Sequence, residues 1–117
     1  MKPGTPEPLL TVVLTTPQTG TAGTFIVMDL LSAVGNFWET LHGEAPQAPR
    51  FLPRLLTIDG EAYRDLHGVL IQPHGAVADY PAPDIVIIPE LAIDPWKPLP
   101  YPPITHLARA RSYTDRD

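Results

Sequence analysis

Cysteine is absent from this chain of 117 residues, and its absence narrows the chemistry that the chain can perform. Without Cys there is no thiol nucleophile, no disulfide and no thiolate ligand for zinc. The four histidines follow no zinc-binding spacing either, so we expect neither a metal site nor a cofactor. A chain without Cys also fits a reducing compartment, and the cytoplasm is the expected location.

Basic residues are few. The sequence has 8 Lys and Arg against 13 Asp and Glu, which gives a net charge of -5. Domains that bind nucleic acid carry a basic surplus or a basic stripe. The one basic cluster here joins Arg109, Arg111 and Arg116, and Asp115 and Asp117 interrupt it. We therefore expect no direct contact between this chain and nucleic acid.

Long hydrophobic runs are also missing, since no apolar stretch approaches the roughly 18 residues of a membrane span. Residues 1–8 hold three prolines and lack the apolar core of a signal peptide. We expect a disordered lead-in over 1–8 and no membrane association. Serine occurs only at Ser32 and Ser112, neither of them in a Gly-x-Ser-x-Gly elbow, which disfavours a serine hydrolase.

Apolar residues make up 44% of the chain, a proportion typical of one globular domain. Apolar runs bounded by turn residues predict three main strands, and helical spacing predicts one long helix. Eight of the 16 prolines lie between Pro81 and Pro103, which excludes a continuous helix there. The expected elements are strands over 9–14, 51–58 and 84–89, a helix over 24–41, a small strand pair over 63–67 and 68–73, a loop or single helical turn over 74–82, and helical character over 104–111 before a polar tail, 112–117.

The predicted helix over 24–41 has a wide apolar surface made of two stripes. One stripe runs through Val27, Leu31, Val34, Trp38 and Leu41, and the adjacent one through Ile26, Leu30, Ala33, Phe37 and Leu41. Such a width is more than one contact with a sheet requires. Two interpretations stay open: a well-buried core helix, or a helix with one stripe on the sheet and part of the other on a partner subunit.

Four segments together resemble the first half of a ThiJ/PfpI-like domain. They are the strand 9–14 with its Gly/Thr loop, the helical run 27–35 with Asp29 among apolar residues, the Pro-His-Gly-Ala-Val-Ala-Asp stretch 73–79, and the strand 84–89. The resemblance covers 9–111 and about half of a family domain. It implies an α/β fold, a flavodoxin-like parallel sheet with flanking helices that is incomplete here. The variant it is most similar to lies at the N-terminus of AraC-type transcriptional regulators.

The chain departs from the family's enzymes at three places. The acid beside the nucleophile falls at Gly23, the Pro-Gly-Gly turn reads Pro89-Glu90-Leu91, and the sequence ends before the Cys elbow that would follow residues 104–111. The resemblance therefore implies a non-catalytic sensor or dimerisation segment, with DNA contacted by a C-terminal helix-turn-helix domain outside this sequence. The alternatives are a fragment of a ThiJ/PfpI-type enzyme without its Cys nucleophile, and a free-standing interaction protein.

Two groups of residues are candidates for function. Thr15, Thr16, Glu90 and Leu91 follow two predicted strands, and ligands gather at the carboxyl ends of strands in open α/β sheets. These four residues form the candidate pocket for a small-molecule effector. The candidate interface is Phe25, Met28, Asp29, Trp38 and His67, including an Asp29–His67 contact possible across a dimer. Because the missing half would leave a sheet edge and an apolar helix face uncovered, we expect a homodimer or larger oligomer.

Overall fold

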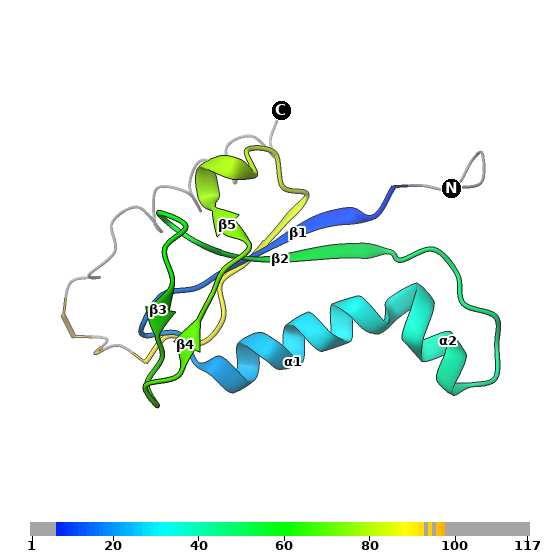
Figure 1. Ribbon diagram of the computed structural model, residues 1–117, viewed down its shortest axis with the longest axis horizontal. Helices are drawn as coiled ribbons and strands as arrows, with labels where there is room; N and C mark the ends of the chain where they lie inside the picture. The colour runs from blue at the N-terminus through cyan, green and yellow to red at the C-terminus, as the bar shows by residue number, and fades with distance from the viewer. Residues whose placement is uncertain (1–6, 93, 95, 98–117) are drawn as a thin grey trace.

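The computed structural model describes residues 7–92, 94, 96 and 97. This part of the chain is an α/β unit in which a four-stranded parallel sheet, ordered β5-β2-β1-β6, is flanked by helix α1 (Figure 1). The elements are β1 (Leu9–Leu14), α1 (Thr21–Ser32), η1 (Ala33–Phe37), α2 (Trp38–Leu41), β2 (Phe51–Thr57), β3 (Tyr63–Arg64), β4 (Leu70–Ile71), β5 (Gly75–Ala76), η2 (Val77–Asp79) and β6 (Ile85–Ile87). The expectations for residues 1–6 and 98–117, the 104–111 helix and the polar tail among them, lie outside the described residues.

Strand β1 lies at the centre of the sheet, as its nearly continuous apolar run predicts. It pairs in parallel with β2, from Leu9 opposite Phe51 to Leu14 opposite Leu56. On its other side it pairs in parallel with β6, where Val12 lies opposite Val86. Residues 11–16 are all buried. The three predicted main strands are thus confirmed as neighbours in one sheet.

The two faces of the sheet are covered by different elements. Val12, Leu14 and Leu56 form a buried cluster on one face, against which Val77 and Tyr80 pack. Figure 1 shows η2 on this side of the sheet and α1 on the opposite side. Since side chains alternate along a strand, Val13 and Leu55 point toward α1. Both are buried, so the sheet holds apolar side chains on each face.

The single helix predicted over 24–41 is wrong in its bounds and in its continuity. Helix α1 begins at Thr21 and ends at Ser32, and a break over 33–37 separates it from the short α2. At the break Val34 has an extended backbone, with ψ of 125°, and Gly35 has φ of +87°. A glycine adopts that positive φ without the strain that a Cβ would cause. The apolar spacing carries no sign of this break, because it continues through residues 33–37.

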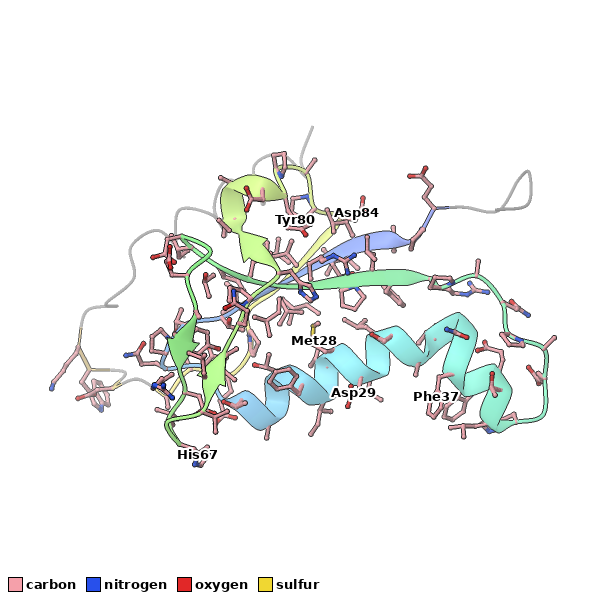
Figure 2. The ribbon with its side chains drawn as sticks, viewed as in Figure 1. Met28, Asp29, Phe37, His67, Tyr80 and Asp84 are labelled. Carbon is pink, nitrogen blue, oxygen red and sulfur yellow. The ribbon has the colours of Figure 1, made fainter. Side chains whose placement is uncertain are left out.

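Helix α1 presents one of its two apolar stripes to the sheet. Val27, Met28 and Leu31 are half-buried, and Figure 2 shows Met28 pointing to the sheet. Ile26 and Leu30 are exposed on the side that faces away. A fully buried core helix is therefore wrong for this part of the chain, because only one layer of the structure lies against α1.

The small strand pair is confirmed: β3 and β4 are antiparallel, with Tyr63 opposite Ile71 and Arg64 opposite Leu70. This hairpin forms a separate two-stranded sheet beside the beginning of α1 (Figure 1). The loop predicted over 74–82 contains the single turn η2, as one alternative had it. It also contains β5, which the sequence did not predict because two residues are too few for a periodic signal.

Candidate functional site

The carboxyl ends of β1 and β6 lie together, as the parallel sheet requires. The Gly20 amide donates to the Glu90 carbonyl at 2.8 Å, and the Ala92 amide donates to the Gln18 carbonyl at 2.8 Å. An antiparallel bridge between Thr19 and Leu91 lies between these two hydrogen bonds. The structure therefore brings the two loops of the candidate pocket side by side.

The two threonines of this candidate pocket hold the loop together. Thr15 is buried and its hydroxyl donates to the Leu56 carbonyl at 3.2 Å. Thr16 is also buried, and its amide donates to the Thr19 hydroxyl oxygen at 2.8 Å while its own hydroxyl accepts from the Gln18 amide at 3.2 Å. Both hydroxyls are engaged within the chain. The hydrogen bonds of Thr15 and Thr16 therefore stabilise the turn that leads into α1.

Glu90 differs from the threonines because its side chain is exposed. Its carboxylate lies beside the start of α1, so that a Cβ built on Gly20 would lie 3.4 Å from Oε2. The positive end of the helix dipole favours a negative charge at this place. Of the four candidate pocket residues, Glu90 is the one whose polar group faces solvent.

Asp65 is a polar centre that sequence reasoning missed. It is buried, and its Oδ2 accepts a hydrogen bond from the Thr21 hydroxyl at 2.8 Å. Its Oδ1 accepts from the amides of His67 at 2.8 Å and Val69 at 2.9 Å. The carboxylate thus closes the β3–β4 turn and fastens it to the first turn of α1. The Asp-Leu-His-Gly sequence over 65–68 is a turn signal that could have pointed to Asp65.

Hydrogen bonding and burial shift two pKa values here. The hydrogen bond from Thr21 holds the pKa of the Asp65 carboxyl below its usual range; the Val69 and His67 amides add to this effect, whereas burial opposes it. Burial raises the pKa of the Tyr63 hydroxyl, the Asp65 charge adds to that rise, and a hydrogen bond with Thr15 opposes it. Asp65 therefore stays ionised and Tyr63 stays neutral near pH 7.

Large apolar side chains are exposed on α1, on the break that follows it and on α2. The apolar helix face consists of Ile26, Leu30, Phe37, Trp38 and Leu41, each between 58 and 64% exposed. Figure 2 shows Phe37 pointing away from the sheet, where the chain turns from α1 into α2. Trp38 stacks on His42 with ring centroids 4.3 Å apart. Exposed apolar surface of this extent favours contact with a partner.

The five candidate interface residues do not share one surface. Phe25 and Trp38 are exposed on the helices, while Met28 points to the sheet (Figure 2). Asp29 is exposed on α1, and His67 is exposed at the end of the β3–β4 hairpin. Figure 2 shows these two side chains on separate elements, so an Asp29–His67 contact would have to form between copies.

The helices carry acidic groups and no basic ones. Residues 9–49 contain no Lys or Arg, whereas α1 carries Asp29 and α2 carries Glu39. The Oε2 atom of Glu39 is buried and has no hydrogen-bond partner within the described residues. A buried carboxylate oxygen without a donor is unfavourable, and its burial keeps this oxygen from a group that approaches from solvent.

Within residues 7–92, 94, 96 and 97, no three His, Asp or Glu side chains cluster to hold a metal ion, and no helix is long and apolar enough to cross a membrane. Comparison with known proteins gave no match to a family model, to a curated protein or to a solved structure.

Proposed function

We propose that this chain is a non-catalytic association segment, and that two copies meet through the apolar helix face. The observation that carries the proposal is the exposure of five large apolar side chains on α1, on the break and on α2: Ile26, Leu30, Phe37, Trp38 and Leu41. Burying a side chain of this size fully contributes about 1.5–3 kcal/mol. At close to 60% exposure, each still offers roughly 1–2 kcal/mol to an association.

The resemblance to ThiJ/PfpI-like domains suggests the larger protein to which this segment belongs. In that proposal the sheet is the first part of an incomplete flavodoxin-like domain, and the segment is the sensing and dimerising portion of a cytoplasmic AraC-type regulator. DNA would be bound by a C-terminal domain outside this sequence. The non-catalytic part of the proposal is supported by Gly23 at the place of the family's acid and by the 0 Cys of the chain.

An effector would meet this segment at the carboxyl ends of β1 and β6. Because the hydroxyls of Thr15 and Thr16 are engaged inside the loop, the exposed carboxylate of Glu90 is the polar group offered to it. Leu91, held by its bridge to Thr19, supplies apolar contact beside it. The proposed effector is thus a small molecule with a cationic or hydrogen-bond-donating group.

Sedimentation equilibrium of the full 117-residue chain tests the association. We expect a species of twice 12.8 kDa, and a monomer for Leu30→Glu, which puts a charge on the apolar helix face. The matched control is Leu70→Glu on β4, where the leucine is 56% exposed but lies outside that face. Circular dichroism reports whether both variants stay folded. A monomeric wild-type chain, or equal effects of the two substitutions, would contradict the proposal.

The regulator context has its own test. An antibody against residues 51–90 would detect the native gene product in its own cells, and its mass would be compared with 12.8 kDa. A species several times heavier supports a regulator with a DNA-binding domain. A species of 12.8 kDa overturns the regulator proposal and leaves the association proposal intact.

A further inference from the structure

The apolar helix face covers only part of the area that a stable dimer needs. Its five side chains are each about 60% exposed, so together they offer roughly 300–500 Å² of apolar surface. A specific and stable protein interface takes about 800 Å² from each partner. The dimer therefore requires further surface from each copy, next to the face itself.

The β3–β4 hairpin carries a second group of exposed apolar side chains, beside the beginning of α1 (Figure 1). Leu66 and Val69 are 59 and 54% exposed. The Val69 amide donates to Asp65 Oδ1 at 2.9 Å, and Oδ2 of the same carboxylate accepts from the Thr21 hydroxyl at 2.8 Å. Phe25 is exposed one helical turn after Thr21, on the same side of α1. Phe25, Leu66 and Val69 are called the hairpin patch below.

The hairpin and the end of α2 carry opposite charges. Arg64 is exposed, and its Nη1 donates to the Gly68 carbonyl at 2.9 Å, which brings the guanidinium to the tip of the hairpin. Glu44 is exposed as well, and its amide donates to the Glu39 carbonyl at 2.8 Å, which holds Glu44 beside α2. Each copy thus offers a cation near the beginning of α1 and an anion near the end of α2.

Two copies related by a two-fold axis can align their helix faces in two ways. If the two α1 helices point in the same direction, each hairpin faces the hairpin of the other copy, and the two Arg64 side chains lie close together. If they point in opposite directions, each hairpin faces α2 of the other copy, and Arg64 lies near Glu44. Since like charges across an interface are unfavourable and opposite charges favour it, the charges select the antiparallel arrangement.

We propose that the hairpin patch of each copy packs against Trp38 and Leu41 of the other copy, with Arg64 of one beside Glu44 of the second. Each contact then occurs twice about the two-fold axis. The patch raises the apolar surface that one copy offers to roughly 450–750 Å², close to what a stable dimer needs. The inference rests on the proposed association and names the surface of the second copy that completes it.

Disulfide trapping in the full chain tests the arrangement, because the native sequence has no Cys to react. Equal parts of a His67→Cys chain and a Glu44→Cys chain are oxidised together, and the products are identified by mass spectrometry. We expect the disulfide between positions 44 and 67 to exceed those between two positions 67 and between two positions 44 by at least about tenfold, since groups held together in a complex react at a high effective concentration. Equal yields, or an excess of the disulfide between two positions 67, overturn the antiparallel arrangement.

The matched control for the hairpin position is Leu70→Cys. Side chains alternate along an extended chain, so Leu70 lies on the opposite side of β4 from Val69 and outside the hairpin patch. Its disulfide with position 44 should form at least about tenfold less than that of position 67. Equal yields from positions 67 and 70 would show that the hairpin is not docked in one orientation, and would overturn the proposed contact.

Charge reversal gives a second and independent test. Arg64→Glu should raise the dimer dissociation constant about tenfold or more, because it places like charges at both symmetric contacts. Adding Glu44→Lys should restore most of the loss, which the missing hydrogen bond to Gly68 alone would not allow. Lys97→Glu, an exposed residue on the segment after β6, is the matched control and should leave the constant unchanged. A dimer unaffected by Arg64→Glu overturns the contact while the proposed association survives, and a monomeric wild-type chain overturns the association itself.

Discussion

The break between α1 and α2 predicts a large loss of stability for Gly35→Ala. Gly35 has φ of +87°, and a Cβ built there would lie 2.5 Å from the Ala48 carbonyl oxygen, a backbone atom. The positive φ costs an alanine about 1–2 kcal/mol. The steric overlap adds roughly 1–3 kcal/mol, the usual cost of forcing extra atoms into a packed site.

The segment that would have to move is held at both ends. The Gln47 amide donates to the Gly35 carbonyl at 2.7 Å, and the Leu9 amide donates to the Arg50 carbonyl at 2.9 Å at the beginning of β1. Displacing Ala48 therefore disturbs both the helix break and the first hydrogen bond beside the sheet. We expect Gly35→Ala to cost about 3 kcal/mol, a large part of the 5–15 kcal/mol stability of an ordinary domain.

Gly43→Ala is the matched control because Gly43 has φ of +72° but nothing within 4 Å of its built Cβ. Gly43→Ala has the same backbone strain as Gly35→Ala and the same reduction in unfolded-chain entropy, but it has no steric overlap. Urea unfolding of both variants, with unchanged m-values, should show Gly35→Ala to be less stable by a further 1–3 kcal/mol. Equal losses would refute the packing of residues 44–50 against the break.

Three further predictions concern the helix, the sheet and the turn at Asp65. Gly23→Ala, at the third residue of α1 with open space around the built Cβ, should stabilise the chain by about 0.4–1 kcal/mol in the same urea assay, and a loss would contradict the helical bounds. His74→Ala removes the Nδ1 acceptor of the Leu55 amide, 2.9 Å away, and should cost about 1 kcal/mol, whereas His74→Asn, whose Oδ1 can replace Nδ1, should cost less. Because the folded pKa of Asp65 is depressed, its stabilisation is complete above the ordinary value of 3.8 and is lost as the pH falls through the folded value. A carbon-detected NMR titration should show this pKa rising in Thr21→Val, and an unchanged value would remove Thr21 as its main cause.

The candidate site was predictable where it depends on strand order. Once 9–14 and 84–89 are parallel strands, their following loops must lie at one edge, and Glu90 is indeed beside Gly20. The structural role of the Thr15 and Thr16 hydroxyls, which hold the turn together, was not predictable. Their hydroxyls bond to groups set by the loop and by β2, and nothing in the local sequence distinguishes a threonine that binds a ligand from one that holds a turn.

The sequence by itself determined the parallel sheet, its three main strands and the presence of a helix between β1 and β2. Those features follow from runs and spacings of apolar residues, which are local properties of a chain. Tertiary structure decided the break at Gly35, the side of α1 that stays exposed, and the bond between Thr21 and Asp65, which joins residues 44 apart in sequence. Each of these features depends on which distant segment lies alongside. The spacing of apolar residues along the chain does not specify that neighbour.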